Sequence, residues 1–125
     1  LRPCRNLRIR SVLGRFLEHS RAYYFHNNGK SELFLSSADL MTRNLSQRIE
    51  LAFPIESLAL QKRIIHEAFD VYWADNAQSF DLQEDGSYER PLQKGERVLA
   101  QEQLLARYDT FPLRLERLKR KGTHE

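Results

Sequence analysis

The stretch HSRAYYFHNNGKSELFLSSADLMTRNLSQRIE, residues 19–50, decides how this chain folds and where its chemistry lies. An aromatic run at residues 22–26 and an apolar run at residues 32–36 are both typical of short strands. The Asn-Asn-Gly segment between them, residues 27–29, predicts a tight turn, because Asn and Gly accept positive φ angles at little cost. The stretch therefore predicts a hairpin of two antiparallel strands.

Side chains suited to phosphate chemistry flank this hairpin on both sides. His19 and Arg21 precede the first strand, and on an extended segment residues two apart point to the same side. Ser37 and Asp39 follow the second strand, and Glu50 comes later. A histidine can be nucleophile or acid/base, and a cation neutralises oxygen charge. We predict a catalytic pair in which Glu50 accepts the Nδ1–H of His19 and orients the ring.

Further donors in the same stretch extend this predicted site. Arg43 and Asn44 lie just beyond the serine turn and, with Arg21 and Ser37, form the predicted phosphate-binding set. An arginine suits this role because its planar guanidinium can hold two phosphate oxygens at once. A structural interpretation competes with the functional one, since Ser37 or Asp39 could instead cap a short helical turn that follows.

The residues around this stretch predict further short strands and one short helix. Alternation of apolar and polar residues predicts a strand at residues 7–12 and another at 48–53, which Pro54 ends. Between the first strand and the hairpin, apolar positions in residues 12–18 line one face of a short helix, although Gly14 weakens that helix by about 1 kcal/mol relative to alanine.

The second half of the chain is predicted to be mainly helical. Apolar residues follow the 3.6-residue period over about residues 56–74, which predicts the longest helix. A small hairpin is predicted within residues 80–88, a helix at residues 100–108 and a further helix at residues 111–118. Strands come early and the long helix late, so the fold class is α/β or α+β.

The composition sets limits on the class of protein. The chain has 125 residues, enough for one domain, with 41% apolar and 30% charged residues, as in a soluble globular protein. A net charge of +3 permits a polyanionic partner without demanding one, and nothing indicates specific nucleic-acid binding. The single cysteine, Cys4, excludes an intrachain disulfide and fits a reducing compartment. No apolar run has the roughly 20 residues of a membrane span. No group of residues has metal-ligand spacing, and we assign none to a metal.

The motifs EHSR, residues 18–21, and SSADLMTRNL, residues 36–45, closely resemble the C-terminal catalytic domain of bacterial polyphosphate kinase. The resemblance runs from about residue 7 to 76 and more weakly to about residue 105. That family belongs to the phospholipase D-like superfamily, whose histidine-x-lysine motif is matched by His19 and Arg21. Arginine replaces the lysine here, and the superfamily's downstream aspartate has no clear match.

This resemblance implies a fold and a domain plan. We expect an α/β, phospholipase D-like fold, a single domain with a mixed sheet flanked by helices. Residues 1–108 would form the domain and residues 109–125 a charged tail. The chain would be a C-terminal fragment of a larger enzyme, and by itself inactive.

The resemblance also implies a reaction. Members of the family reversibly transfer the terminal phosphoryl group of ATP to polyphosphate, with Mg²⁺, through a phosphohistidine that lies in an earlier part of the enzyme. His19 would be the second, supporting histidine of that site, with Glu50. The expected partners are ATP or ADP, polyphosphate and the remainder of the kinase chain. The full-length form would be a homo-oligomer in the cytoplasm, with peripheral membrane association as an alternative.

Two other functions stay open at this point. The first is a phospholipase D-like phosphodiesterase or nuclease, in which a dimer brings two copies of His19 together as nucleophiles. The second is a catalytically silent module that binds polyanions through the basic C-terminal end of the chain.

Overall fold

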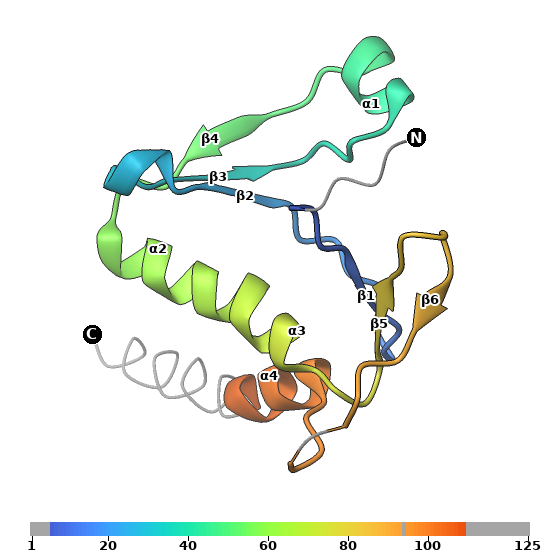
Figure 1. Cartoon of the computed structure of the whole chain (residues 1–125). Coiled ribbons are helices and arrows are strands. Elements are labelled where there is room, and N and C mark those ends of the chain that lie inside the picture. Colours follow the sequence, from blue (N-terminus) through green and yellow to red (C-terminus); the bar gives the residue numbers. More distant parts are fainter. Residues whose placement is uncertain (1–5, 94, 110–125) are drawn as a thin grey trace, which may run out of the picture. The chain divides into compact units, whose positions relative to one another are not determined.

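The computed structural model describes residues 6–93 and 95–109 (Figure 1). These residues divide into two compact units. One unit is the continuous segment Leu17–Trp73, and the other combines the residues up to Phe16 with those from Ala74 onward.

The predicted hairpin forms the centre of the Leu17–Trp73 unit. Strands β2 (Ala22–Phe25) and β3 (Glu32–Ser36) pair antiparallel, with Tyr23 opposite Phe34. The connection is a short 3₁₀ turn (Asn27–Gly29), and its three residues have φ angles of 44°, 51° and 87°. Positive φ at three successive positions explains the Asn-Asn-Gly sequence, and the predicted turn is confirmed.

A third strand completes this sheet. Strand β4 (Ala52–Pro54) pairs antiparallel with β3, which gives the order β2-β3-β4. The strand is shorter than the predicted residues 48–53, and Pro54 belongs to it instead of ending it. A proline is tolerated there because β4 lies at the edge of the sheet, where one side of the strand needs no donor.

The helix α1 (Thr42–Gln47) lies between β3 and β4 and begins without the predicted cap. Its N-cap residue is Met41, and no side chain caps it. The structural alternative, in which Ser37 or Asp39 caps this helix, is wrong, because the Asp39 carboxylate accepts from Arg21 Nε and the Ser37 hydroxyl donates to Glu50 Oε2.

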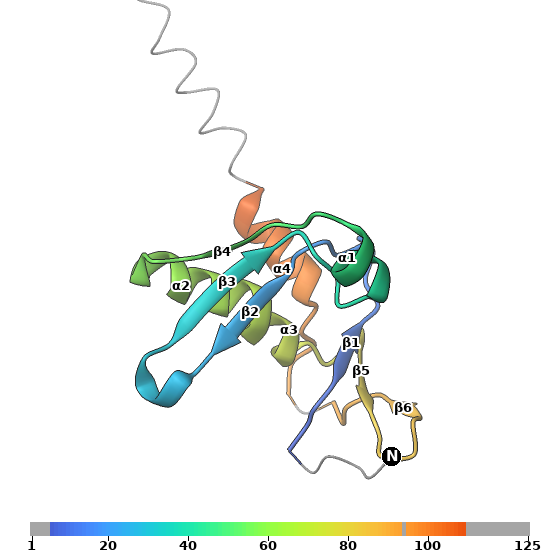
Figure 2. The same cartoon turned by 90° about the horizontal axis from the view of Figure 1, so that it is seen from above.

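The predicted long helix is confirmed and begins two residues later than expected. It consists of α2 (Leu58–Ile65), a π-helical segment (His66–Asp70) and α3 (Val71–Ala74). Ser57 is the N-cap and its side chain accepts a hydrogen bond from Leu60 N. The helix runs beneath the sheet in the view of Figure 1 and crosses it in Figure 2, and Leu33 and Val71 are buried in this unit.

The other unit contains a second antiparallel sheet. Strands β1 (Arg10–Val12), β5 (Ser79–Leu82) and β6 (Tyr88–Glu89) lie in the order β1-β5-β6. The predicted small hairpin is thus confirmed, and the strand predicted at residues 7–12 is shorter than expected. Helix α4 (Ala100–Tyr108) has the predicted bounds.

A fully buried aspartate joins the elements of this unit. Asp75 accepts hydrogen bonds from the backbone N–H groups of Ala77 and Gln78 through Oδ1, and from Ala100 N at the start of α4 through Oδ2. One carboxylate therefore fixes both the turn into β5 and the beginning of α4. Backbone donors that would otherwise be unsatisfied are bonded in this way.

The helix predicted at residues 12–18 is absent, and Gln101 of α4 gives the reason. The Gln101 side chain accepts a hydrogen bond from Phe16 N at 2.8 Å and donates one to Phe16 O at 2.8 Å. A Cβ on Gly14 would lie 2.2 Å from Gln101 Oε1. The segment thus bonds to a distant amide instead of to itself, and glycine is required for close approach.

The mixed α/β class is confirmed, but the sheet differs from the prediction. Among the described residues there are two three-stranded sheets instead of one mixed sheet, and all their pairs are antiparallel. Alternation in the sequence indicates a strand without naming its partner, and β1 pairs with a strand about 70 residues away. The helix predicted at 111–118, the tail from residue 110 and the residues before 6 lie outside the described part.

Candidate functional site

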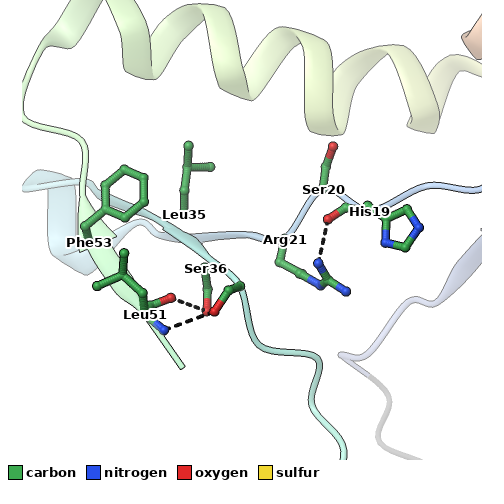
Figure 3. Close-up of a pocket in the computed structure, with 8 residues that line it drawn as sticks. His19, Ser20, Arg21, Leu35, Ser36, Leu51 and Phe53 are labelled. Atoms are coloured by element: carbon green, nitrogen blue, oxygen red, sulfur yellow. Dashed lines mark hydrogen bonds between the residues drawn. The ribbon is translucent and has the colours of Figure 1, made fainter. Parts of the chain in front are cut away.

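An open pocket of about 380 Å³ lies at the end of the β2-β3-β4 sheet where β2 begins and β3 ends (Figure 3). Because β2 and β3 are antiparallel, the residues that precede β2 and those that end β3 meet at this end of the strands. Polar residues share the lining with apolar residues of β3, of β4 and of the position just before β4; the lining consists of His19, Ser20, Arg21, Leu35, Ser36, Ser37, Leu51 and Phe53. The pocket thus brings together three of the predicted residues: His19, Arg21 and Ser37.

Arg21 is held in a fixed position by two hydrogen bonds. Its Nη1 donates to the backbone oxygen of His19 at 3.0 Å (Figure 3). Its Nε donates to Asp39 Oδ1 at 2.7 Å. The ion pair lowers the pKa of the Asp39 carboxyl, chiefly through the hydrogen bond from Arg21. Asp39 therefore stays ionised and orients the guanidinium at the pocket.

Glu50 belongs to a second hydrogen-bonded group. Its Oε2 accepts from Ser37 Oγ at 2.5 Å and its Oε1 accepts from Asn44 Nδ2 at 2.8 Å. Hydrogen bonds from Ser37 and then Asn44 lower the pKa of the Glu50 carboxyl. Ser37 Oγ also accepts from Leu51 N, so this group ties the end of β3 to the start of β4.

The predicted hydrogen bond between Glu50 and His19 is not formed in the part of the chain that the structure describes. Both carboxylate oxygens of Glu50 are directed to Ser37 and Asn44 instead. The two donors, Ser37 and Asn44, are only 13 and 6 positions from Glu50 in the sequence. His19 is exposed, and Figure 3 shows its ring at the opposite end of the pocket from Phe53.

Asn44 and Arg43, adjacent in α1, have different surroundings. Only 4% of Asn44 is exposed, and its Oδ1 has no hydrogen-bond partner among the described residues. Its amide thus supports Glu50 from below the surface and does not face solvent. Arg43 is exposed and close enough to Asp39 to help lower the pKa of that carboxyl.

Several residues of the site were missed by sequence reasoning. Ser36 Oγ donates to Leu51 O at 3.1 Å and accepts from Ala38 N at 3.0 Å, so it shapes the turn after β3. Leu35 and Phe53 form the apolar wall (Figure 3). The apolar run around Leu35 and the alternation around Phe53 predicted strands but gave no signal that these two side chains lie next to the polar residues.

The described side chains do not fit a magnesium site. Within residues 6–93 and 95–109 no group of three or more His, Cys, Asp and Glu side chains could hold a metal ion. The carboxylates of Asp39 and Glu50 accept hydrogen bonds from the pocket residues Arg21 and Ser37. Mg²⁺ is commonly held by substrate phosphates together with one or two carboxylates, and we assign no residue of this chain to it.

Comparison with known proteins identifies the family. The model of the family described as polyphosphate kinase C-terminal domain 2 matches residues 3–102. Polyphosphate kinases of Pseudomonas aeruginosa, Neisseria meningitidis and Burkholderia lata are 53%, 52% and 49% identical to this chain over 85 residues. The aligned part is 68% of this chain and 12% of each of those proteins.

A solved structure agrees with this assignment. The crystal structure of polyphosphate kinase from Porphyromonas gingivalis superimposes with a TM-score of 0.76 at 34% identity. The match covers 84% of this chain and 16% of that one. In the described residues, no helix is both long enough and apolar enough to cross a membrane. The fold, the pocket residues and the sequence matches lead to one conclusion: this chain belongs to the polyphosphate kinase C-terminal domain 2 family.

Proposed function

We propose that this domain supplies one half of the phosphoryl-transfer site of a polyphosphate kinase. The reaction is the reversible transfer of the terminal phosphoryl group of ATP to polyphosphate, through a phosphohistidine elsewhere in the enzyme. The observation that carries the proposal is the convergence of His19, Arg21 and Ser37 at one pocket. Family membership supports it, because the chain shares about half of its aligned residues with polyphosphate kinases.

Arg21 is the proposed phosphate-binding residue. Phosphoryl transfer is catalysed mainly by positioning and by stabilisation of charge on the phosphoryl oxygens. The bonds to Asp39 and to the His19 carbonyl use two of the five N–H donors of the guanidinium, so donors remain for phosphate oxygens. The exposed Arg43 adds positive charge close to the same carboxylate.

His19 is the proposed catalytic residue of this half-site. His19 is exposed and is one of the residues that line the pocket, so its ring can contact the transferred phosphoryl group or exchange a proton with it. Glu50 and Asn44 support this arrangement through Ser37, which lines the same pocket. We therefore propose that Glu50 fixes the turn at Ser37 and does not orient His19 directly.

The remainder of the enzyme is the proposed partner. The chain spans about one eighth of the curated relatives it matches. Leu51 and Phe53 are 64% and 43% exposed at the pocket, and apolar exposure of this kind is typical of surfaces that other protein segments cover. We propose that further nucleotide contacts, any Mg²⁺ and the homo-oligomer interface belong to the whole protein, and that this chain alone is inactive. With ATP as substrate we expect a cytoplasmic protein, and binding at the membrane surface is the alternative.

The test is formation of ATP from ADP and polyphosphate with Mg²⁺, measured for the whole kinase that contains this domain and for this chain alone. We expect activity only in the whole protein, and a loss of about 100-fold or more in His19→Ala, the usual contribution of acid–base catalysis. His26→Ala is the matched control, because His26 is also exposed but lies at the hairpin turn. A whole protein in which His19→Ala and His26→Ala are equally active would refute the role of His19, and hydrolysis of a phosphodiester would point to the superfamily alternative.

A further inference from the structure

The segment that carries His19 has no regular secondary structure. Residues 17–20 belong to neither a helix nor a strand, and all four are exposed. A catalytic side chain on such a segment needs other contacts to fix it, because an exposed loop is otherwise mobile. The contacts on either side of His19 therefore decide how well its ring is placed.

On its C-terminal side, His19 is fixed through Arg21. The Arg21 guanidinium donates to the backbone oxygen of His19, and the backbone oxygen of Arg21 accepts from Ser36 N at the end of β3. Asp39 holds the same guanidinium from the turn beyond β3. This side of the segment is thus anchored to the sheet.

On its N-terminal side, the contact comes from the long helix. The Tyr72 hydroxyl donates to Glu18 Oε1 at 2.7 Å, across 54 positions of sequence, and Glu18 directly precedes His19. Burial and this hydrogen bond raise the pKa of the Tyr72 hydroxyl, so it remains a donor at neutral pH. A helix of the same unit thereby holds the segment at the residue next to the histidine.

An irregularity in the helix determines which way Tyr72 points. The π-helical segment His66–Asp70 ends two residues before Tyr72. A π turn accommodates one additional residue, which rotates the following positions by about 100° relative to an uninterrupted α-helix. Such π-bulges are rare and frequently occur at functional sites. Without the bulge, Tyr72 would be directed to a different side of the helix.

We propose that Tyr72 and Glu18 form a positioning pair, oriented by the π-helical segment, that holds the His19 ring in place for phosphoryl transfer. The catalytic role of His19 rests on the proposed function, whereas the restraint on residues 17–20 does not. Tyr72 acts through Glu18 and the backbone, and it does not contact the reacting atoms. Because Arg21 is anchored separately by Asp39, loss of the pair should disturb His19 more than phosphate binding.

The first experiment measures backbone motion in this 125-residue chain by ¹⁵N relaxation. We expect the order parameters of His19 and Ser20 to fall from about 0.85, the value of rigid backbone, to below about 0.6 in Tyr72→Phe. Tyr24→Phe is the control, because it removes a hydroxyl from β2 that makes no hydrogen bond with the described residues. If Tyr72→Phe fails to fold, Glu18→Ala removes the acceptor at an exposed position and should give the same result.

The second experiment measures kinetics in the whole kinase that contains this domain. We expect Tyr72→Phe to lower kcat about 10-fold while the KM for polyphosphate changes less than about twofold, because orientation is lost and phosphate binding is kept. Unchanged order parameters in both Tyr72→Phe and Glu18→Ala would overturn the proposal. A whole kinase whose wild type lacks activity would refute the proposed function instead, and the relaxation comparison would still test the restraint.

Discussion

Gly14 and Gln101 should be strongly coupled in stability. In the folded chain, a Cβ at position 14 would lie 2.2 Å from Gln101 Oε1 and 2.4 Å from Gln101 Cδ. Gly14→Ala must therefore displace the Gln101 side chain, which makes two hydrogen bonds of 2.8 Å with the backbone of Phe16. With about 1 kcal/mol for each bond, Gly14→Ala should lower the free energy of unfolding by about 2 kcal/mol.

The same substitution should behave differently when Gln101 has been removed. A Gln101→Ala background removes the three atoms nearest to a Cβ at position 14, and Gly→Ala reduces the conformational entropy of the unfolded chain. Gly14→Ala should then stabilise by about 0.5 kcal/mol. The coupling free energy of the double-mutant cycle is the difference between the two effects, about 2.5 kcal/mol.

The assay is urea unfolding of the wild type, both single variants and the double variant, followed by circular dichroism. Gly86→Ala is the control, because Gly86 has open space around it and a φ of 89°. Its cost comes from backbone strain, about 1 kcal/mol, and should be the same with and without Gln101. Equal costs of Gly14→Ala in the two backgrounds would refute the reasoning that a contact with Gln101 excludes a side chain at position 14.

Three further predictions concern the remaining elements. Asp75→Ala should lower the free energy of unfolding by about 3 kcal/mol in urea titrations, because three backbone N–H groups, including that of Ala100, lose their acceptor; a cost below about 1 kcal/mol would contradict this. Arg10 lowers the pKa of Asp81 through two hydrogen bonds, so the stability that this carboxylate contributes is present above pH ~4 and is lost as the pH falls through its lowered pKa; between pH 5 and about 2 the wild type should lose more stability than Asp81→Asn. Ser57→Ala should cost only about 0.5 kcal/mol, because its capping hydrogen bond is long at 3.5 Å, and a melting temperature lowered by more than about 8 °C would contradict that value.

Local patterns in the sequence were sufficient for much of the fold. The Asn-Asn-Gly turn required positive φ, so the β2–β3 hairpin followed from three adjacent residues. The 3.6-residue period predicted the long helix and α4, because burial on one face selects apolar residues at that spacing. Three of the predicted site residues, His19, Arg21 and Ser37, line one pocket, and all three belong to the single stretch of residues 19–50.

The hydrogen-bond partners of the site residues could not be predicted from the sequence. Glu50 was expected to orient His19, yet Ser37 and Asn44 occupy its oxygens. The sequence shows that a carboxylate, a histidine and a hydroxyl are near one another. It does not show which donor reaches the carboxylate at 2.5 Å, because that depends on the turn after β3.

By itself, then, the sequence determined the Asn-Asn-Gly turn, the long helix and α4, since these depend on neighbours within a few positions. Only the tertiary structure decided the division into two antiparallel sheets, the absence of the helix at residues 12–18 and the contact between Tyr72 and Glu18. Each of these depends on groups 54 or more positions apart in the chain, brought together by folding. No local period or propensity records such a pairing, because its free energy is gained only when the distant segments meet.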